Sequence, residues 1–202
     1  MESDIISKVL KIQTAKIHYL EVGNPQNPSV LLLHGASFSS TTWKELGTLK
    51  RLAQKNFHVI AIDLPGYGKS ESISDYHSEF LPKLFNKLHL QGAVLVSPSM
   101  SGIYSLSFAV QHSHQLQGLV AIAPVGIMKM NQQLRGIEVP TLAIWGSNDR
   151  IIPVEQADLL VELLPNARKF ILPKAGHACY MKAPNKFHEK LIQFIEKIAT
   201  EN

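Results

Sequence analysis

The chain has 202 residues, the size expected of one folded domain that buries a full sheet with helices on both faces. Hydrophobic residues make up 45% and charged residues 18%, a balance that excludes a disordered chain, and no repeat or low-complexity tract interrupts it. The formal net charge of +4 comes from basic and acidic residues interspersed along most of the chain, so a nucleic-acid partner is not expected.

No run of about 18 apolar residues occurs, and the first residues lack the basic and apolar regions of a signal peptide. We therefore expect neither a membrane span nor a membrane partner, and a cytoplasmic or nuclear location. The single cysteine, Cys179, cannot form an internal disulfide and fits a reducing compartment. A monomer without a metal ion or cofactor is expected.

Alternating apolar and polar residues over 8–22 predict an antiparallel hairpin at a sheet edge. The continuous apolar runs in 30–33 and 57–64 predict strands buried on both faces, as in parallel sheets. Between these two strands, Thr41 or Thr42 is expected to cap a helix that runs to about residue 54.

In the rest of the chain, helices and strands alternate. The expected helices are 75–90 with a kink at Pro82, 102–112, 153–164 and one that begins at Pro184; the expected strands are 93–97, 118–123, 139–145 and 168–172. Together with the hairpin and the two buried strands, these make a mostly parallel eight-stranded sheet with right-handed crossovers and helices on both faces. The piece before residue 139 is expected to be short and irregular.

The segment 92–102, with the sequence GAVLVSPSMSG, joins a strand to a helix without a loop. In such a turn the residues two before and two after the apex nearly touch, so both must be small. Ser97 and Ser101 meet this limit, and Pro98 forces an extended backbone ahead of the apex. This register predicts that Ser99 is the apex of a nucleophile elbow, although glycines usually occupy the flanks. The alternative is an ordinary strand-to-helix corner.

A serine hydroxyl needs a base within hydrogen-bond reach, and that base needs an acidic partner that holds its tautomer. His177 and Asp149 follow predicted strands after the elbow, at the carboxyl ends where such sheets bind ligands. We therefore predict a catalytic triad of Ser99, Asp149 and His177. For the oxyanion hole, we predict the backbone N–H groups of Ala36 and Met100.

At four places the sequence resembles the α/β-hydrolase superfamily: LHG at 33–35, DLPGYGKS at 63–70, the elbow, and GH at 176–177. More closely, it resembles the α/β-hydrolase domain-containing protein 14 family, whose elbow also reads SPSxSG and whose last motif reads GHxCY, here 176–180. The resemblance covers nearly the whole chain. It implies an α/β-hydrolase fold and a small esterase-like enzyme that acts on short acyl groups, with acyl transfer as a second activity.

Three hypotheses follow. The first is a serine hydrolase that cleaves short-chain acyl esters or amides, on a small molecule or an acylated protein side chain, through an acyl-enzyme on Ser99. The second is an acyltransferase, or deacylase, that passes the acyl group to a thiol such as coenzyme A. The third is a non-catalytic protein-interaction module on the same fold. Only the 13 residues of 126–138 separate Val125 from the strand that begins at 139. This is too few for a lid domain, so we expect an open site.

Three other features are given structural roles. Cys179 has no elbow and is expected to be a small buried hydrophobe. Gly66 and Gly68 lack the spacing of a phosphate-binding loop and are expected to shape the pocket wall. Basic residues surround His177 and are expected to form a solvated face with a modest attraction for anions. They are Arg168, Lys169, Lys174, Lys182, Lys186, Lys190 and Lys197.

Overall fold

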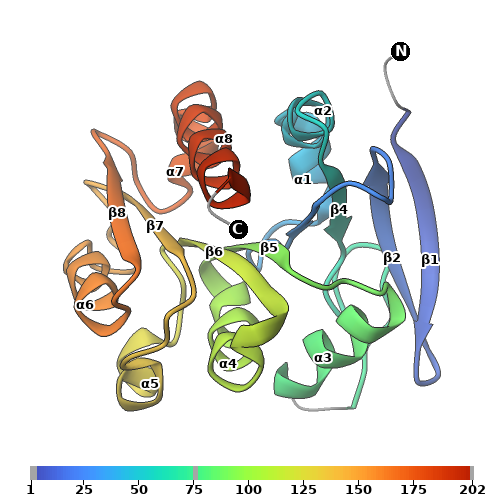
Figure 1. Ribbon diagram of the computed structural model, residues 1–202, viewed down its shortest axis with the longest axis horizontal. Helices are drawn as coiled ribbons and strands as arrows, with labels where there is room; N and C mark the ends of the chain where they lie inside the picture. The colour runs from blue at the N-terminus through green and yellow to red at the C-terminus, as the bar shows by residue number, and fades with distance from the viewer. Residues whose placement is uncertain (1–3, 75–76, 201–202) are drawn as a thin grey trace.

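The computed structural model describes residues 4–74 and 77–200, and its centre is one eight-stranded sheet (Figure 1). The strand order is β1-β2-β4-β3-β5-β6-β7-β8. The bounds are β1 Ile6–Ile12, β2 Ala15–Val22, β3 Ser29–Leu32, β4 His58–Ile62, β5 Ala93–Pro98, β6 Leu116–Ile122, β7 Thr141–Gly146 and β8 Ala167–Leu172. The pairs β1–β2 and β2–β4 are antiparallel and the other neighbours are parallel, which confirms the predicted mostly parallel sheet.

Helices cover both faces of the sheet (Figure 1). One face carries α1 Ser40–Glu45, α2 Thr48–Ala53, α7 Cys179–Lys182 and α8 Pro184–Thr200; the other carries α3 His77–Lys87, α4 Gly102–His112, α5 Ile127–Leu134 and α6 Glu155–Leu163. Short 3-10 turns precede and follow α4, at Ser99–Ser101 and Ser113–Gln115. The sheet is therefore the middle layer of three.

Each parallel strand supplies side chains to two cores, because successive residues of a strand point to opposite faces. In β3, Leu31 packs with the core under α3 to α6, whereas Val30 and Leu32 pack with the core under α1, α2, α7 and α8. This explains the unbroken apolar runs in the sequence. Among the described residues, no helix is long and apolar enough to cross a membrane.

The helix predicted from Thr41 or Thr42 to about residue 54 is wrong in two respects. Its side-chain cap is Ser39, whose hydroxyl accepts from the backbone N–H of Thr41. It is also broken in two by Gly47, which has a φ of 73°, a left-handed conformation that favours glycine. The helix predicted over 75–90 is present as α3, with Pro82 inside it, while residues 75 and 76 lie outside the described part of the chain.

The piece expected to be irregular before β7 contains a helix, α5, and the short helix α7 was also not predicted. The buried side chains of Ile127 and Leu134 attach α5 to the core beside α4 and α6. Because α5 packs against α4 and α6 in the helix layer on one side of the sheet, it does not form a separate lid domain.

Candidate active site

The apex of the predicted elbow is Ser99, which follows β5 directly and has a φ of 52°. A left-handed backbone is unusual for a residue with a side chain, and such strain is concentrated at functional sites. Two contacts maintain the turn. The carbonyl of Ser99 accepts a 2.9 Å hydrogen bond from the N–H of Val125, and a Cβ on Gly102 would lie 2.4 Å from the carbonyl oxygen of Val125. The backbone of Val125 therefore comes so close that residue 102 must be glycine.

The two small residues that flank the apex are fully buried serines, joined in a network of hydroxyl groups. The Ser101 hydroxyl donates to the carbonyl of Pro98 at 2.7 Å. The Ser105 hydroxyl donates to the Ser97 hydroxyl at 2.6 Å. A buried hydroxyl without a partner would be costly, so these bonds make serine acceptable where glycine is usual.

The three residues of the predicted triad come together. Ser99 Oγ lies 2.7 Å from His177 Nε2, and His177 Nδ1 lies 2.8 Å from Asp149 Oδ2. Because an ionised carboxylate only accepts hydrogen bonds, the ring proton is on Nδ1, and Nε2 accepts the Ser99 hydroxyl. The other carboxylate oxygen of Asp149 accepts from the backbone N–H groups of Ile151 and Ile152, at 2.8 and 3.0 Å.

The side chains of Asp149 and His177 differ in their exposure to solvent. The carboxylate of Asp149 is fully buried, whereas 18% of the His177 side chain is exposed. The acid is thus fixed by three hydrogen bonds away from solvent, while the imidazole can be reached from outside. This is the order of burial expected when only the serine and the imidazole meet a substrate.

Asp149 and His177 are far apart in sequence, and contacts between their loops bring them together. The N–H of Asn148 donates to the carbonyl of Ala175, and the N–H of Lys174 donates to the hydroxyl of Ser147, both at 2.9 Å. A Cβ on Gly146 would lie 2.3 Å from the carbonyl of Ala175. Only glycine therefore permits this approach at the end of β7.

A cavity of about 210 Å³ opens beside Ser99 and His177. Its walls come from the loop after β3, the ends of β5 and β6, and the loops that carry Asp149 and His177; apart from Ser99 and His177 they are Gly35, Ala36, Ser37, Phe38, Pro98, Ile122, Ile151, Ala178 and Tyr180. Ala36, one of the two predicted oxyanion donors, is among them. Met100, the other, is half-buried and follows Ser99 in the 3-10 turn.

The expectation that Gly66 and Gly68 shape this wall is wrong, because neither lines the cavity. Their loop is instead bound to Asp63. The Asp63 carboxylate accepts from the N–H of Lys69 at 2.9 Å, and a Cβ on Gly68 would lie 2.3 Å from Asp63 Oδ2. The carboxylate also accepts from the N–H of Ser40 at 2.7 Å. The loop thus fastens β4 to the start of α1.

His34 positions the peptide that joins Gly35 to Ala36. The sequence placed His34 in the LHG motif but did not indicate this role. The N–H of Leu64 donates to His34 Nε2 at 2.9 Å, so the ring proton is on Nδ1, which donates to the carbonyl of Gly35 at 2.8 Å. Burial lowers the pKa of His34 and keeps it neutral. Because the Gly35 carbonyl and the Ala36 N–H belong to one planar peptide, fixing the first orients the second.

Two further serine–histidine–acid arrays occur in the sheet. His18 lies 2.8 Å from both Ser7 Oγ and Asp63 Oδ2. In the other array, His58 lies 2.7 Å from Glu21 Oε1 and 3.1 Å from Ser29 Oγ. Hydrogen-bonded triplets of this kind are therefore not sufficient evidence of a catalytic centre.

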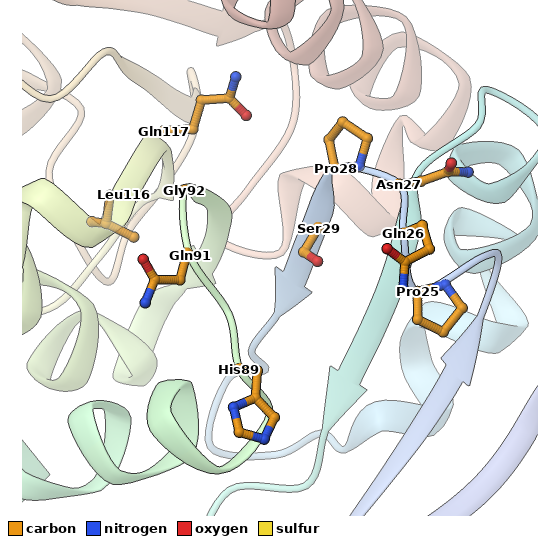
Figure 2. A pocket seen from close by; sticks show the side chains of 10 residues that line it. All are labelled: Pro25, Gln26, Asn27, Pro28, Ser29, His89, Gln91, Gly92, Leu116 and Gln117. Carbon is orange, nitrogen blue, oxygen red and sulfur yellow. The ribbon is translucent and has the colours of Figure 1, made fainter.

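Ser29, the serine of the array centred on His58, lines a second, larger cavity of about 570 Å³ (Figure 2). Its lining comes from 25–29, His89, 91–92 and 116–117, at the amino ends of β3, β5 and β6. It includes the amide side chains of Gln26, Asn27, Gln91 and Gln117. Ser29 begins a regular strand and is not one of the positive-φ residues. Ligands of such sheets bind at the carboxyl ends, which favours the cavity at Ser99.

Cys179 is buried, as expected, and burial raises the pKa of its thiol to about 12. A protonated thiol is a poor nucleophile, so this cysteine is not suited to attack a substrate. Among the described residues, no group of three or more His, Cys, Asp or Glu side chains could hold a metal ion.

Comparison with known proteins agrees with this geometry. The Alpha/beta hydrolase family matches residues 30–136, more than half of the chain, and the alpha/beta hydrolase fold matches residues 126–184. The chain belongs to the α/β-hydrolase family. The structure of this hydrolase is similar to that of a "predicted CIB-like hydrolase" from Thermoplasma acidophilum, with a TM-score of 0.92 and 22% sequence identity over 96% of this chain and 99% of that one.

Closer relatives of the hydrolase also confirm the resemblance to the α/β-hydrolase domain-containing protein 14 family. This chain is 39% identical to Protein ABHD14A of Mus musculus over 193 residues, which span 91% of this chain and 78% of the relative. It is 40% identical over 177 residues to a Homo sapiens protein named "Putative protein-lysine deacylase ABHD14B", spanning 83% of each chain.

Sequence reasoning missed most of the cavity wall of this hydrolase. Phe38, Ile151 and Tyr180 line the cavity, and none of them was assigned a role in advance. Phe38 follows Ala36 and Ile151 follows Asp149, each by two residues. This closeness in sequence was the signal that could have identified them as part of the wall. Tyr180 is also part of the GHxCY motif and stacks on Trp43, with ring centroids 5.1 Å apart.

Proposed function

We propose that this α/β-hydrolase removes short acyl groups from esters or amides through a covalent acyl-enzyme on Ser99. The observation that carries the proposal is the hydrogen-bonded array from Ser99 through His177 to Asp149, at 2.7 and 2.8 Å, with its serine at a left-handed turn beside a cavity. The other two arrays lack this combination of turn and cavity.

In the acylation step, Ser99 Oγ attacks the carbonyl carbon of the substrate while its proton passes to His177 Nε2. The positive imidazolium that results is stabilised by the Asp149 carboxylate at Nδ1. The negative oxygen of the tetrahedral intermediate accepts from the backbone N–H groups of Ala36 and Met100. Collapse of the intermediate breaks the bond to the leaving group, which takes the proton from His177 and departs as an alcohol or amine.

In the deacylation step, an acceptor gives its proton to His177 Nε2 and attacks the acyl carbon. The proton then returns to Ser99 Oγ as the ester bond breaks. The His177 side chain is 18% exposed, so an acceptor can approach the ring from solvent. Water as the acceptor yields a free acid, whereas a thiol yields a thioester.

The relatives support an acyl substrate. The human relative is named a putative protein-lysine deacylase, and removal of an acyl group from a lysine side chain cleaves an amide. For this chain we propose the same bond class, on a small molecule or on a protein side chain. The cavity of about 210 Å³ suits a small acyl group better than a long chain.

Labelling with a fluorophosphonate tests the proposal, because the probe reacts with an activated serine. The wild type should be labelled and should hydrolyse p-nitrophenyl acetate, and Ser99→Ala should do neither. Ser29→Ala and Ser7→Ala are matched controls from the other two arrays and should be labelled like the wild type. Equal labelling of Ser99→Ala and wild type would contradict the assignment, and labelling of neither would favour a non-catalytic module.

Product analysis distinguishes the acceptors. Incubation with an acetyl-lysine peptide should give free acetate if the acceptor is water. If added coenzyme A turns the product into acetyl-coenzyme A and accelerates turnover, the enzyme is an acyltransferase that uses the same first half-reaction.

A further inference from the structure

A groove runs between the outer strands β7 and β8 and helix α8, on the face of the sheet opposite α6 (Figure 1). It consists of two cavities of about 300 and 420 Å³, and both are lined by Arg168 and Lys197. Because β8 is the last strand of the sheet, no described strand covers its outer edge. The groove therefore lies at an open side of the molecule, apart from the cavity at Ser99.

The groove is strongly basic. Its lining includes Arg168, Lys169, Lys190 and Lys197, and no described Asp or Glu side chain lines either cavity. Part of this charge is neutralised from outside the groove, since Lys169 pairs with Asp158 on α6 and Lys190 lies 3.0 Å from Glu189. Arg168, by contrast, lies over an aromatic ring.

Between these cations lie four apolar side chains. Phe170 is partly exposed, whereas Leu142, Phe194 and Ile198 are buried. The Arg168 guanidinium lies 5.3 Å from the centre of the Phe194 ring, and Lys190 Nζ lies 5.4 Å from the centre of the Phe170 ring. Stacking on a ring holds a guanidinium in place without occupying its in-plane N–H groups, which stay available for a carboxylate.

We propose that this groove binds an acidic, extended peptide segment of a protein partner, with the carboxylates on Arg168 and Lys190. Such a segment complements the positive charge of the groove. A nucleic acid would meet the cations but would find both aromatic rings already covered by Arg168 and Lys190. The interaction goes beyond the hydrolytic activity and does not require Ser99.

The length of β8 sets the length of the probe. Its 6 residues extend about 20 Å at a rise of about 3.3 Å per residue, so a fluorescein-labelled peptide of about eight residues with alternating Glu and Leu covers the groove. Fluorescence anisotropy should show saturable binding that weakens at least about tenfold when the salt concentration rises from about 50 to about 500 mM. The same peptide with Gln in place of Glu should bind at least about tenfold more weakly.

The double variant Arg168→Glu/Lys190→Glu should bind the acidic peptide at least about tenfold more weakly than the wild type. Lys11→Glu/Lys129→Glu is the matched control, because it changes the net charge equally at exposed residues of β1 and α5, away from the groove. An unchanged thermal midpoint and unchanged fluorophosphonate labelling of Ser99 would show that each variant is folded.

Equal weakening by both double variants would overturn the proposal, because the peptide would then respond only to net charge. It would also be overturned if the Glu and Gln peptides bound alike, or if a single-stranded DNA oligonucleotide or phosphatidylserine vesicles bound more tightly than the peptide. These outcomes are separate from the proposed function, which depends on labelling of Ser99 and is measured independently of the peptide.

Discussion

The hydroxyl groups of Ser97 and Ser101 lie 3.0 Å apart on either side of the turn that carries Ser99. A tight strand-to-helix turn forces these two positions together, which is why glycine is usual there. In this chain the two serines tolerate the contact because their hydroxyls bond to each other, to Ser105 and to the carbonyl of Pro98. The close approach is thus a buried polar contact.

This relationship predicts how the elbow responds to substitution. Ser101→Val should lower the free energy of unfolding by about 1–3 kcal/mol, because it overfills the turn and leaves the Pro98 carbonyl without its hydroxyl donor. It should also slow fluorophosphonate labelling of Ser99. Ser101→Gly, the matched control, keeps the space and should label at close to the wild-type rate. Equal labelling rates in wild type and Ser101→Val would show that the contact does not position Ser99.

Ser99→Ala should leave the fold intact and change the free energy of unfolding by less than about 1 kcal/mol, or increase it slightly. The hydroxyl bonds to His177 in a partly exposed site, so it is placed for reaction more than for stability. Thermal and denaturant unfolding measure this directly. A large drop in midpoint would mean that Ser99 is a structural residue of an ordinary corner.

The other two members of the array should behave differently from nearby residues. His177→Ala should lower kcat/KM by about three orders of magnitude or more, and Asp149→Asn by about four, because the amide would leave the imidazole in the wrong tautomer. Hydrolysis of an aryl acetate by purified variants measures both. His188→Asn is a useful control, since it removes a histidine outside the cavity; a His177→Ala rate within tenfold of the control would point to another base.

The cavity size and the position of α5 predict a preference for short acyl groups. A chain that extends past Phe38 and Tyr180 remains in water, and each methylene left there forgoes about 0.8 kcal/mol of transfer free energy. In a series of p-nitrophenyl esters, kcat/KM should be highest between acetate and butyrate. Phe38→Ala should move the optimum to longer chains. Activity that keeps rising to dodecanoate in the wild type would contradict an open, short-acyl site.

His188 should make stability depend on pH. Its Nε2 lies 2.8 Å from Thr48 Oγ1, its Nδ1 is buried without a partner among the described residues, and burial, together with the charge of Arg51, lowers its pKa to about 4. The unfolded chain has a histidine pKa of about 6.5 and so binds the proton first as the pH falls. Stability from this residue is therefore complete above about pH 6.5 and is lost progressively down to about pH 4.

Between about pH 7.5 and pH 4.5 this single group should lower the free energy of unfolding by about 2 kcal/mol. Urea unfolding at the two pH values measures the loss. His188→Asn keeps a side chain that can bond to Thr48 but does not titrate, so its loss should be smaller by about that amount. His114→Asn removes an exposed histidine as a control. Identical pH dependence in the wild type and His188→Asn would rule out the effect.

Much of the chain was predictable from local patterns, for physical reasons. Strands buried on both faces need unbroken apolar runs, as in β3 and β4, and a tight strand-to-helix turn needs small residues, as at Ser97 and Ser101. Those two constraints act on neighbours in the sequence, so they were sufficient to place the sheet strands and to select Ser99. The four motifs shared with the α/β-hydrolase superfamily, at 33–35, 63–70, the elbow and 176–177, indicated the fold family.

The pairing of Asp149 with His177 was predicted, but only the tertiary structure showed that other acids meet His18 and His58. In the part of the chain that the structure describes, serine–histidine–acid arrays centre on His18, His58 and His177, and each joins residues that are distant in sequence. The break at Gly47, the attachment of α5 to the core and the wall formed by Phe38 and Tyr180 depend likewise on packing between elements. Local propensity carries no information about such contacts, because their energy arises only when the sheet has brought the segments together.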